Sequence, residues 1–234
     1  MNLLISIIIP TKNEPAVETL ISKITEVMKP LNMNYHILAV DKSDDDTQDR
    51  LRTLEIEILR QKSKGLGGAI VEGLKASRGD LVFVMDADLS HDPKFIPSFI
   101  EKSKEGLDIV VGSRRIEGGK VIGWGVYRKM VSRIANSIGR LGSGLKISDI
   151  TSGYRLYRKT VIESLDFQNF KTSGYAFQIE VLSKALNMGF RIGEVPIVFY
   201  DRAKGKSKLS KKDIFEFLLT SVRLGFRRFV KSLS

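Results

Sequence analysis

The first half of the chain alternates short apolar runs with amphipathic stretches of helical period. The apolar runs are rich in β-branched residues, which predicts strands buried on both faces, and they span residues 3–9, 35–40, 56–60, 81–85 and 108–111. Between these runs, the pattern predicts helices that begin near Val17, Thr47, Gly65 and Phe95. Strands that alternate with helices predict an α/β fold with a mostly parallel sheet, in which ligands bind beyond the carboxyl ends of the strands.

The second half of the chain has a less regular pattern. Helices are predicted over residues 127–141, 176–188 and 214–233, and short strands over 155–157 and 191–199, the latter interrupted by Pro196. A polar, basic loop over residues 204–212 precedes the last helix. The sequence shows no internal repeat and no linker, so we expect one domain over residues 1–210, followed by an amphipathic basic helix over 211–234.

The composition adds a large positive charge and excludes cysteine chemistry. The 234 residues include 38 Lys and Arg against 27 Asp and Glu, for a net charge of +11, and no Cys. Disulfides and thiolate sites are therefore excluded, and His36 and His91 are too isolated in sequence for a metal cluster or a catalytic triad. No apolar run approaches the roughly 20 residues that span a bilayer, so we expect a cytosol-facing chain that touches a membrane at most.

Much of the positive charge lies near the C-terminal end. Residues 202–234 contain ten Lys and Arg against two acids, and the last predicted helix carries an apolar stripe made of Phe215, Leu219, Val222, Phe226, Phe229, Val230 and Leu233. Arg223, Arg227 and Lys231 follow the edge of this stripe. Such a helix suits an anionic membrane surface, and packing on its own domain or on a partner subunit is the alternative. Nucleic acid is not expected as a partner because no RNA- or DNA-binding motif accompanies the charge.

An acidic pair follows the fourth predicted strand. Asp86 and Asp88 are two residues apart, so their carboxylates leave the same side of an extended chain. At a strand end, such a pair can hold a divalent cation together with substrate phosphate oxygens, and Ser90 would add a weak oxygen ligand. The alternative is a helix N-cap at Asp88 or Ser90, just before Pro93.

Other polar positions follow neighbouring predicted strands. Asp41 ends the second strand, and residues 10–14 follow the first, where they either clamp a base or ribose or form a plain loop with Asn13 as a helix cap. The glycine-rich helix start at Lys64 and Gly65 either approaches a phosphate through backbone N–H groups or packs the helix closely on the sheet. It matches neither a P-loop nor a dinucleotide fingerprint.

Gln178 and Glu180 lie among apolar neighbours in the predicted helix over residues 176–188. Side chains two positions apart on a helix do not face each other. The pattern favours a solvated polar face, and a side chain directed into a cleft is the alternative.

Several stretches, taken in order, resemble the dolichol-phosphate mannosyltransferase branch of the GT-A, family 2 glycosyltransferases. They are IIIPTKNE (7–14), KGLGGA (64–69), MDADLSHDPKFIPSFI (85–100), DIVVGSR (108–114), GWGVYRKMVSRIAN (123–136), SDITSGYRLYRK (148–159), GYAFQIE (174–180) and IGEVPIVFYDRAKGKSKL (192–209). The resemblance implies a GT-A fold and an inverting transfer of mannose from GDP-mannose to dolichyl or another polyprenyl phosphate. It also implies Mg²⁺ or Mn²⁺ as cofactor and a place at the cytoplasmic face of a membrane, and it leaves open a small membrane-anchoring subunit as partner.

On the donor side, the resemblance implies a set of nucleotide- and diphosphate-binding residues: Pro10, Asn13, Glu14, Asp41, Lys64, Gly65, Asp86, Arg202 and Lys208. Asp86 and Asp88 match the metal-binding pair, with Ser90 beside them. The family commonly has a second Asp directly after the acid at Asp41, where this chain has Lys42 in a loop one residue shorter. A UDP-glucose donor is therefore the alternative to GDP-mannose.

On the acceptor side, Arg114, Arg128 and Ser132 match positions that handle the acceptor phosphate. The implied catalytic residues are Asp88, Arg114, Arg128, Gln178 and Glu180. Arginine suits this role because its planar fork grips phosphate oxygens in pairs. A lipid phosphate is already ionised near neutral pH, so it needs no strong general base. The remaining alternative is a protein that binds a nucleotide sugar or an anionic lipid without turnover.

Overall fold

The structure is a computed structural model that describes residues 3–170, 174–201 and 211–233. Among these residues, seven strands form one sheet in the order β3-β2-β1-β4-β7-β5-β8. The strands are β1 (Leu4–Thr11), β2 (Asn34–Asp41), β3 (Glu57–Arg60), β4 (Leu81–Val84), β5 (Ile109–Ser113), β7 (Arg155–Arg158) and β8 (Ile192–Pro196). All neighbours pair in parallel except β7, which is antiparallel to both β4 and β5. The predicted α/β fold with a mostly parallel sheet is thus confirmed.

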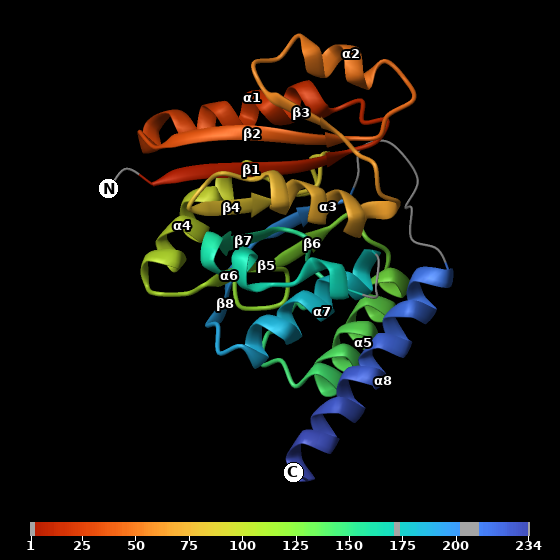
Figure 1. The fold of residues 1–234 in the computed structure, drawn as a ribbon. Coiled ribbons are helices and arrows are strands. Elements are labelled where there is room, and N and C mark those ends of the chain that lie inside the picture. The colour runs from red at the N-terminus through yellow and green to blue at the C-terminus, as the bar shows by residue number, and fades with distance from the viewer. Residues whose placement is uncertain (1–2, 171–173, 202–210, 234) are drawn as a thin grey trace.

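Helices cover both faces of the sheet (Figure 1). One face packs against α1 (Val17–Met28) and α4 (Ile96–Lys104), and the other against α3 (Gly65–Ala76), α6 (Lys159–Ser164) and α7 (Gly174–Asn187). Strand β1 shows why, because Ile5, Ile7 and Ile9 pack into the first layer and Ile8 into the second. The short helix α2 (Thr47–Arg52) and the 3₁₀ turns Lys29–Leu31, Pro93–Phe95 and Phe167–Asn169 complete the connections.

A second, two-stranded sheet lies beside the first in the described part of the chain. Its strands are β6 (Lys120–Ile122) and β9 (Val198–Tyr200), paired in parallel. The predicted strand over 191–199 is therefore two strands, β8 and β9, in different sheets. Pro196 ends the first of them, because proline has no N–H to donate to a continued ladder. The basic loop predicted over 204–212 falls largely outside the described residues, and the last helix begins at Lys211.

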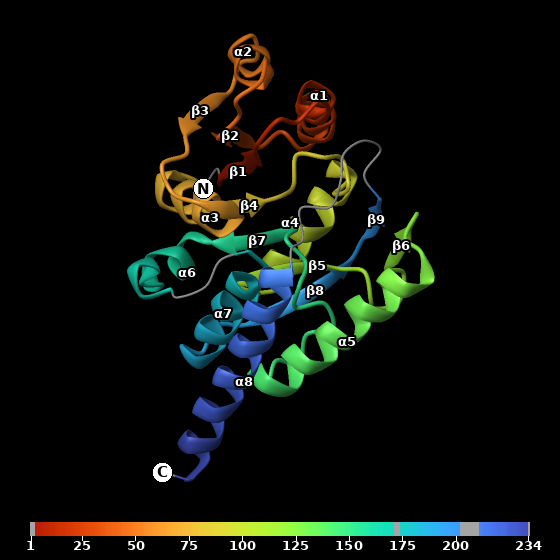
Figure 2. The same ribbon diagram turned by 90° about the vertical axis from the view of Figure 1, so that its right-hand side faces the viewer.

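The last helix, α8 (Lys211–Leu233), runs beside α5 (Val126–Ser143), as both views show (Figures 1 and 2). Glycines make the contact close: a side chain at Gly142 would collide with the backbone carbonyl of Ser221. Phe217 and Leu224 of α8 are buried in the same core as α7. The inner face of the C-terminal helix therefore belongs to the main body of the protein. No helix within the described residues is long and apolar enough to cross a bilayer.

Candidate active site

The acidic pair lies in a tight turn directly after β4. Leu89 adopts a left-handed conformation with φ of 63°, which turns the chain so that the backbone N–H of Ser90 donates to Asp88 Oδ1 at 3.0 Å. The Ser90 hydroxyl donates to the same oxygen. Asp88 is only 8% exposed, whereas the Asp86 side chain is 32% exposed. Ser90 therefore orients the Asp88 carboxylate, and its role as a weak metal ligand stays a prediction.

The alternative in which Asp88 or Ser90 caps a helix is wrong. The cap of the following 3₁₀ turn is Asp92, whose side chain accepts a hydrogen bond from the Lys94 N–H at 3.1 Å. The carboxylates of Asp86 and Asp88 thus remain at the carboxyl end of β4, where an α/β sheet binds its ligands.

His91 holds this turn in place, a role that its isolation in the sequence concealed. The backbone N–H of Asp86 donates to His91 Nδ1 at 3.0 Å. The ring is buried, stacked on Tyr154 at 5.0 Å and edge-on to Phe199 at 5.5 Å. Burial lowers the pKa of His91 despite the nearby charges of Asp86 and Asp88, so the ring is neutral near pH 7 and Nδ1 can accept.

Gly153 marks a space shared by several predicted site residues. A Cβ placed there would lie 3.7 Å from Asp86 Oδ1, 3.8 Å from Gln178 Nε2 and 3.8 Å from His91 Cε1. The helix α7 therefore brings Gln178 next to the acidic turn. Gln178 Oε1 is buried and has no hydrogen-bond partner among the described residues. It is an acceptor that a ligand hydroxyl in this space can satisfy.

The solvated polar face predicted for Gln178 and Glu180 is wrong, because both side chains are buried. Glu180 instead lies 3.4 Å from the ammonium of Lys184, one turn along the same helix. Periodicity could not show this burial, since the elements that cover α7 come from elsewhere in the chain.

The donor set of the acidic turn fits a hard divalent cation. Within the described residues, no group of three or more His, Cys, Asp and Glu side chains is arranged to hold a metal ion. Two carboxylates, Asp86 and Asp88, are nevertheless the usual protein share of a Mg²⁺ site, in which substrate phosphate oxygens and water complete the shell. The chemistry of these oxygens thus agrees with Mg²⁺ or Mn²⁺ at this turn.

Asp41 is completely buried between the loops that follow β1 and β2. Its Oδ1 accepts from the hydroxyls of Thr11 and Ser43 at 3.0 and 2.6 Å, and its Oδ2 from Arg60 at 2.8 Å. This carboxylate shapes the loops and leaves no exposed oxygen for a base in the present arrangement.

Asn13 joins the same two loops. It has a left-handed φ of 54°, and its side-chain amide exchanges hydrogen bonds with Asp44 at 2.6 and 3.0 Å. The prediction of Asn13 as a helix cap is wrong, since the N-cap of α1 is Ala16. Pro10 is the penultimate residue of β1, which ends at Thr11, and the Glu14 N–H donates to the Thr47 hydroxyl. The nucleotide-loop candidates therefore form one fixed rim at the carboxyl edge of the sheet.

The glycines of α3 and its start differ in their surroundings, and the approach of a phosphate stays a prediction. A side chain at Gly68 or Gly73 would collide with Ser63 or Ile8, so these glycines allow close packing of α3. Lys64 and Gly65, by contrast, are exposed, and the space beside Gly65 is open. Their position at the N-terminus of α3 leaves backbone N–H groups available for a phosphate.

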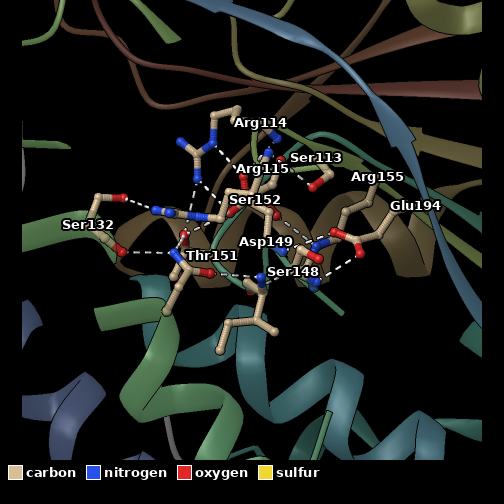
Figure 3. Close-up of polar contacts among 12 residues, drawn as sticks. Ser113, Arg114, Arg115, Ser132, Ser148, Asp149, Thr151, Ser152, Arg155 and Glu194 are labelled. Atoms are coloured by element: carbon tan, nitrogen blue, oxygen red, sulfur yellow. Dashed lines mark hydrogen bonds and ion pairs between the residues drawn. The ribbon is translucent and has the colours of Figure 1, made fainter. Parts of the chain in front are cut away.

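Arg114 is held by a buried carboxylate that the sequence reading did not single out. Its Nε and one terminal nitrogen donate to Asp149 at 2.6 and 2.7 Å (Figure 3). Burial raises the pKa of Asp149, but the charge and hydrogen bonds of Arg114 outweigh burial and lower it overall. Next to this pair, Arg115 donates to the Ser132 hydroxyl at 2.8 Å.

A cavity of about 450 Å³ opens beside these arginines. Half of the residues in its wall are basic, and none is acidic: Arg114, Arg115, Gly119, Lys120, Val121, Ile122, Trp124, Lys129, Ser132 and Arg133. Two of the three predicted acceptor residues, Arg114 and Ser132, thus line one cavity. The third, Arg128, lies outside the wall and pairs with Asp201 at 2.8 Å. Arg202 and Lys208 lie outside the described residues.

One loop, residues 148–153, joins the basic cavity to the acidic turn. Asp149 grips Arg114 at one end, and Gly153 borders Asp86 at the other. The Glu194 carboxylate accepts from the backbone N–H groups of Ser148 and Asp149 at 2.8 and 3.0 Å. The buried Arg155 donates to three backbone carbonyls, those of Ile150, Ser152 and Gln178. This loop is therefore fixed from both sides, and it sets the two charged regions side by side.

Comparison with known proteins decides the family. Residues 6–166 match the sequence model of Glycosyl transferase family 2. The chain belongs to glycosyltransferase family 2. This family 2 glycosyltransferase is also similar to several named mannosyltransferases, which agrees with the resemblance seen in its motifs. The Dolichol-phosphate mannosyltransferase of Pyrococcus furiosus is 41% identical over 94% of this chain, and the chain spans 63% of that protein's length.

Two bacterial relatives are matched over more of their length. The Undecaprenyl-phosphate mannosyltransferase of Micrococcus luteus is 36% identical, with 93% of this chain and 92% of the relative covered. The Polyprenol monophosphomannose synthase of Mycolicibacterium smegmatis is 37% identical, with 94% and 86% covered. These relatives confirm the resemblance to the dolichol-phosphate mannosyltransferase branch of this glycosyltransferase family.

A solved structure confirms the fold of the family 2 glycosyltransferase. The glucosyl-3-phosphoglycerate synthase from Mycobacterium tuberculosis, crystallised with Mn²⁺, UDP and phosphoglyceric acid, superposes with a TM-score of 0.74. The match covers 95% of this chain and 78% of that one at 20% sequence identity. The predicted GT-A fold is thus confirmed.

Proposed function

We propose that this family 2 glycosyltransferase transfers mannose from GDP-mannose to the phosphate of dolichol or a related polyprenol. The names of its relatives support both the sugar and the lipid phosphate. The observation that carries the proposal is the loop over 148–153, which brings Gly153 close to the Asp86 carboxylate and binds the Arg114 guanidinium through Asp149. A diphosphate donor and a phosphate acceptor are both anions. The loop holds the acidic turn, which would bind the metal, beside the basic cavity, which would bind the acceptor.

In the proposed reaction, an oxygen of the lipid phosphate attacks the anomeric carbon of mannose. The new bond forms as the bond from that carbon to the diphosphate breaks. GDP leaves, and the configuration at the anomeric carbon is inverted. Asp86 and Asp88 would hold the Mg²⁺ or Mn²⁺, which supplies positive charge for the departing diphosphate. Arg114 and its basic neighbours would bind the acceptor phosphate at a fixed angle and lessen its repulsion from the donor.

A transfer assay tests this proposal. Purified chain is incubated with dolichyl phosphate and either radiolabelled GDP-mannose or UDP-glucose, with Mg²⁺, Mn²⁺ or excess EDTA. We expect label in the lipid phase from GDP-mannose alone, and its loss with EDTA. Transfer from UDP-glucose instead would favour the glucosyltransferase alternative, and binding of both substrates without transfer would favour the non-catalytic alternative.

The proposed membrane contact involves two helices. The stripe predicted on α8 is exposed at Phe215, Leu219, Val222, Phe226 and Val230, while the side chains of Phe229 and Leu233 lie outside the described set. The sequence reading missed that α5, which runs alongside, is also apolar on its outer face, at Val126, Tyr127, Met130, Ile134 and Leu141. Exposed apolar side chains beside exposed cations such as Lys129 and Arg133 suit an anionic lipid surface.

Charge placed on the α5 surface should release the protein from lipid. We expect the double variant Met130→Glu, Ile134→Glu to reduce sedimentation with phosphatidylglycerol-rich vesicles about ten-fold, because each carboxylate would face anionic headgroups. Leu186→Glu is the matched control, since Leu186 is an exposed apolar residue on α7 and should leave binding unchanged. Equal vesicle binding by both variants would contradict the surface assignment.

The cytoplasmic location and the anchoring subunit stay predictions.

A further inference from the structure

Trp124 lies between β6 and α5, at the edge of the basic cavity. Gly123 allows the chain to turn sharply just before Trp124. It has φ of 90°, and a Cβ there would lie 2.8 Å from the Cβ of Asp201. Only glycine suits so sharp and close a turn. The turn leads the chain from β6 directly into the indole and then into α5.

The indole contacts both arginines that the family resemblance implies for the acceptor phosphate. The guanidinium carbon of Arg128 lies 4.1 Å from the centre of the indole ring, and that of Arg114 lies 5.5 Å away. Phe199 packs edge-on to the indole at 5.4 Å and is itself 5.2 Å from the Arg114 guanidinium. Two cations that repel each other are thus held around one aromatic pair.

The two arginines depend on this aromatic pair to different degrees. Arg114 is fixed independently by its two hydrogen bonds to the buried Asp149. Arg128 pairs with Asp201, and both side chains of that pair are more than a third exposed. An exposed ion pair of this kind orders a long side chain only weakly. The indole face is therefore the main element that places Arg128.

The position of the indole depends on contacts of its ring and not on a hydrogen bond of its N–H. Its N–H is buried and has no hydrogen-bond partner within the described residues. Ring contacts thus determine its position, and a phenylalanine at position 124 would retain much of that contact.

We propose that Trp124 is a positioning residue that holds Arg128 beside Arg114 at the acceptor-phosphate site. This inference rests on the proposed function, because it takes the basic cavity as the place where a polyprenyl phosphate binds. Trp124 affects binding of the acceptor through Arg128 and does not affect binding of the nucleotide sugar.

Fluorescence tests the contact without any turnover, because Trp124 is the only tryptophan of the chain. Arg128→Gln should shift the indole emission maximum to the red, since water replaces the guanidinium on the ring face. Arg140→Gln removes the same charge from an exposed position in the last turn of α5 and should leave emission unchanged. An unchanged emission maximum in Arg128→Gln would overturn the stacking.

Calorimetry with farnesyl phosphate tests the consequence for binding. We expect Trp124→Leu to weaken binding by about ten-fold and Trp124→Phe by at most about three-fold, as the cation–aromatic contact is lost or kept. The double variant Trp124→Leu, Arg128→Gln should bind no more than about two-fold more weakly than Arg128→Gln alone, because both changes remove one interaction. Fully additive losses would show that the two residues act separately and would overturn the proposal.

Steady-state kinetics separates this inference from the proposed function. Trp124→Leu should raise the KM for the lipid phosphate and leave the KM for GDP-mannose unchanged. A parallel rise of both KM values would overturn the positioning role. A wild-type chain that binds farnesyl phosphate but transfers no sugar would refute the proposed function alone, and the binding and fluorescence results would still decide the role of Trp124.

Discussion

Asp88→Asn is expected to lower the proposed mannosyl transfer by about a thousand-fold or more while leaving the fold intact. The amide keeps an oxygen that can accept from Ser90, so the turn after β4 is retained. It removes the negative charge that, with Asp86, would hold the cation, and that cation is expected to stabilise the leaving diphosphate by several kcal/mol. The loss should appear in kcat at saturating substrates.

Asp92→Asn is the matched control for this prediction. It removes the same charge four residues further on, at a residue that caps a 3₁₀ turn and that asparagine can replace. Transfer should remain near the wild-type rate. Binding of Mn²⁺ in the presence of GDP, followed by electron paramagnetic resonance, should be lost in Asp88→Asn and kept in Asp92→Asn. Wild-type turnover in Asp88→Asn would remove the metal assignment.

Gly153 offers a graded steric test of the donor site. Gly153→Ala should retain most activity, because a Cβ there makes contacts of 3.7–3.8 Å with Asp86, Gln178 and His91, which is ordinary van der Waals distance. Gly153→Leu should lower kcat/KM by about a hundred-fold, since its longer side chain would fill the space between the acidic turn and Gln178. Gly153 does not have a positive φ, so neither substitution strains the backbone.

Thermal melting and donor titration separate blocking from unfolding. Both Gly153 variants should melt close to the wild-type temperature, and Gly153→Leu should show a raised KM for GDP-mannose. A Gly153→Leu enzyme with the wild-type KM for the donor would place the sugar elsewhere. If a Gly153 variant melts at a much lower temperature, its binding of GDP shows whether the donor site is still folded.

Some site residues were predictable because their signal is local. Asp86 and Asp88 stand two apart directly after a buried strand, and any sheet that uses this strand puts them at its carboxyl edge. Arg114 and Ser132 were named through the resemblance and do line one cavity. Residues that act on them were not predictable. Asp149 reaches Arg114 from a distant part of the chain, and no spacing in the sequence indicates that contact. His91 is near Asp86 in sequence, but its contact depends on how the turn folds and on the distant Tyr154 and Phe199 that enclose its ring.

The amino-acid sequence by itself determined the α/β alternation, the acidic turn and the amphipathic C-terminal helix, because periodicity and strand-end position are properties of short segments. Only the tertiary structure decided that β7 inserts antiparallel between β4 and β5, and that Gln178 and Glu180 are buried. It also decided that α5 shares the exposed apolar surface of α8. Each of these depends on which distant element covers a given face, and that choice is made by packing of the whole chain.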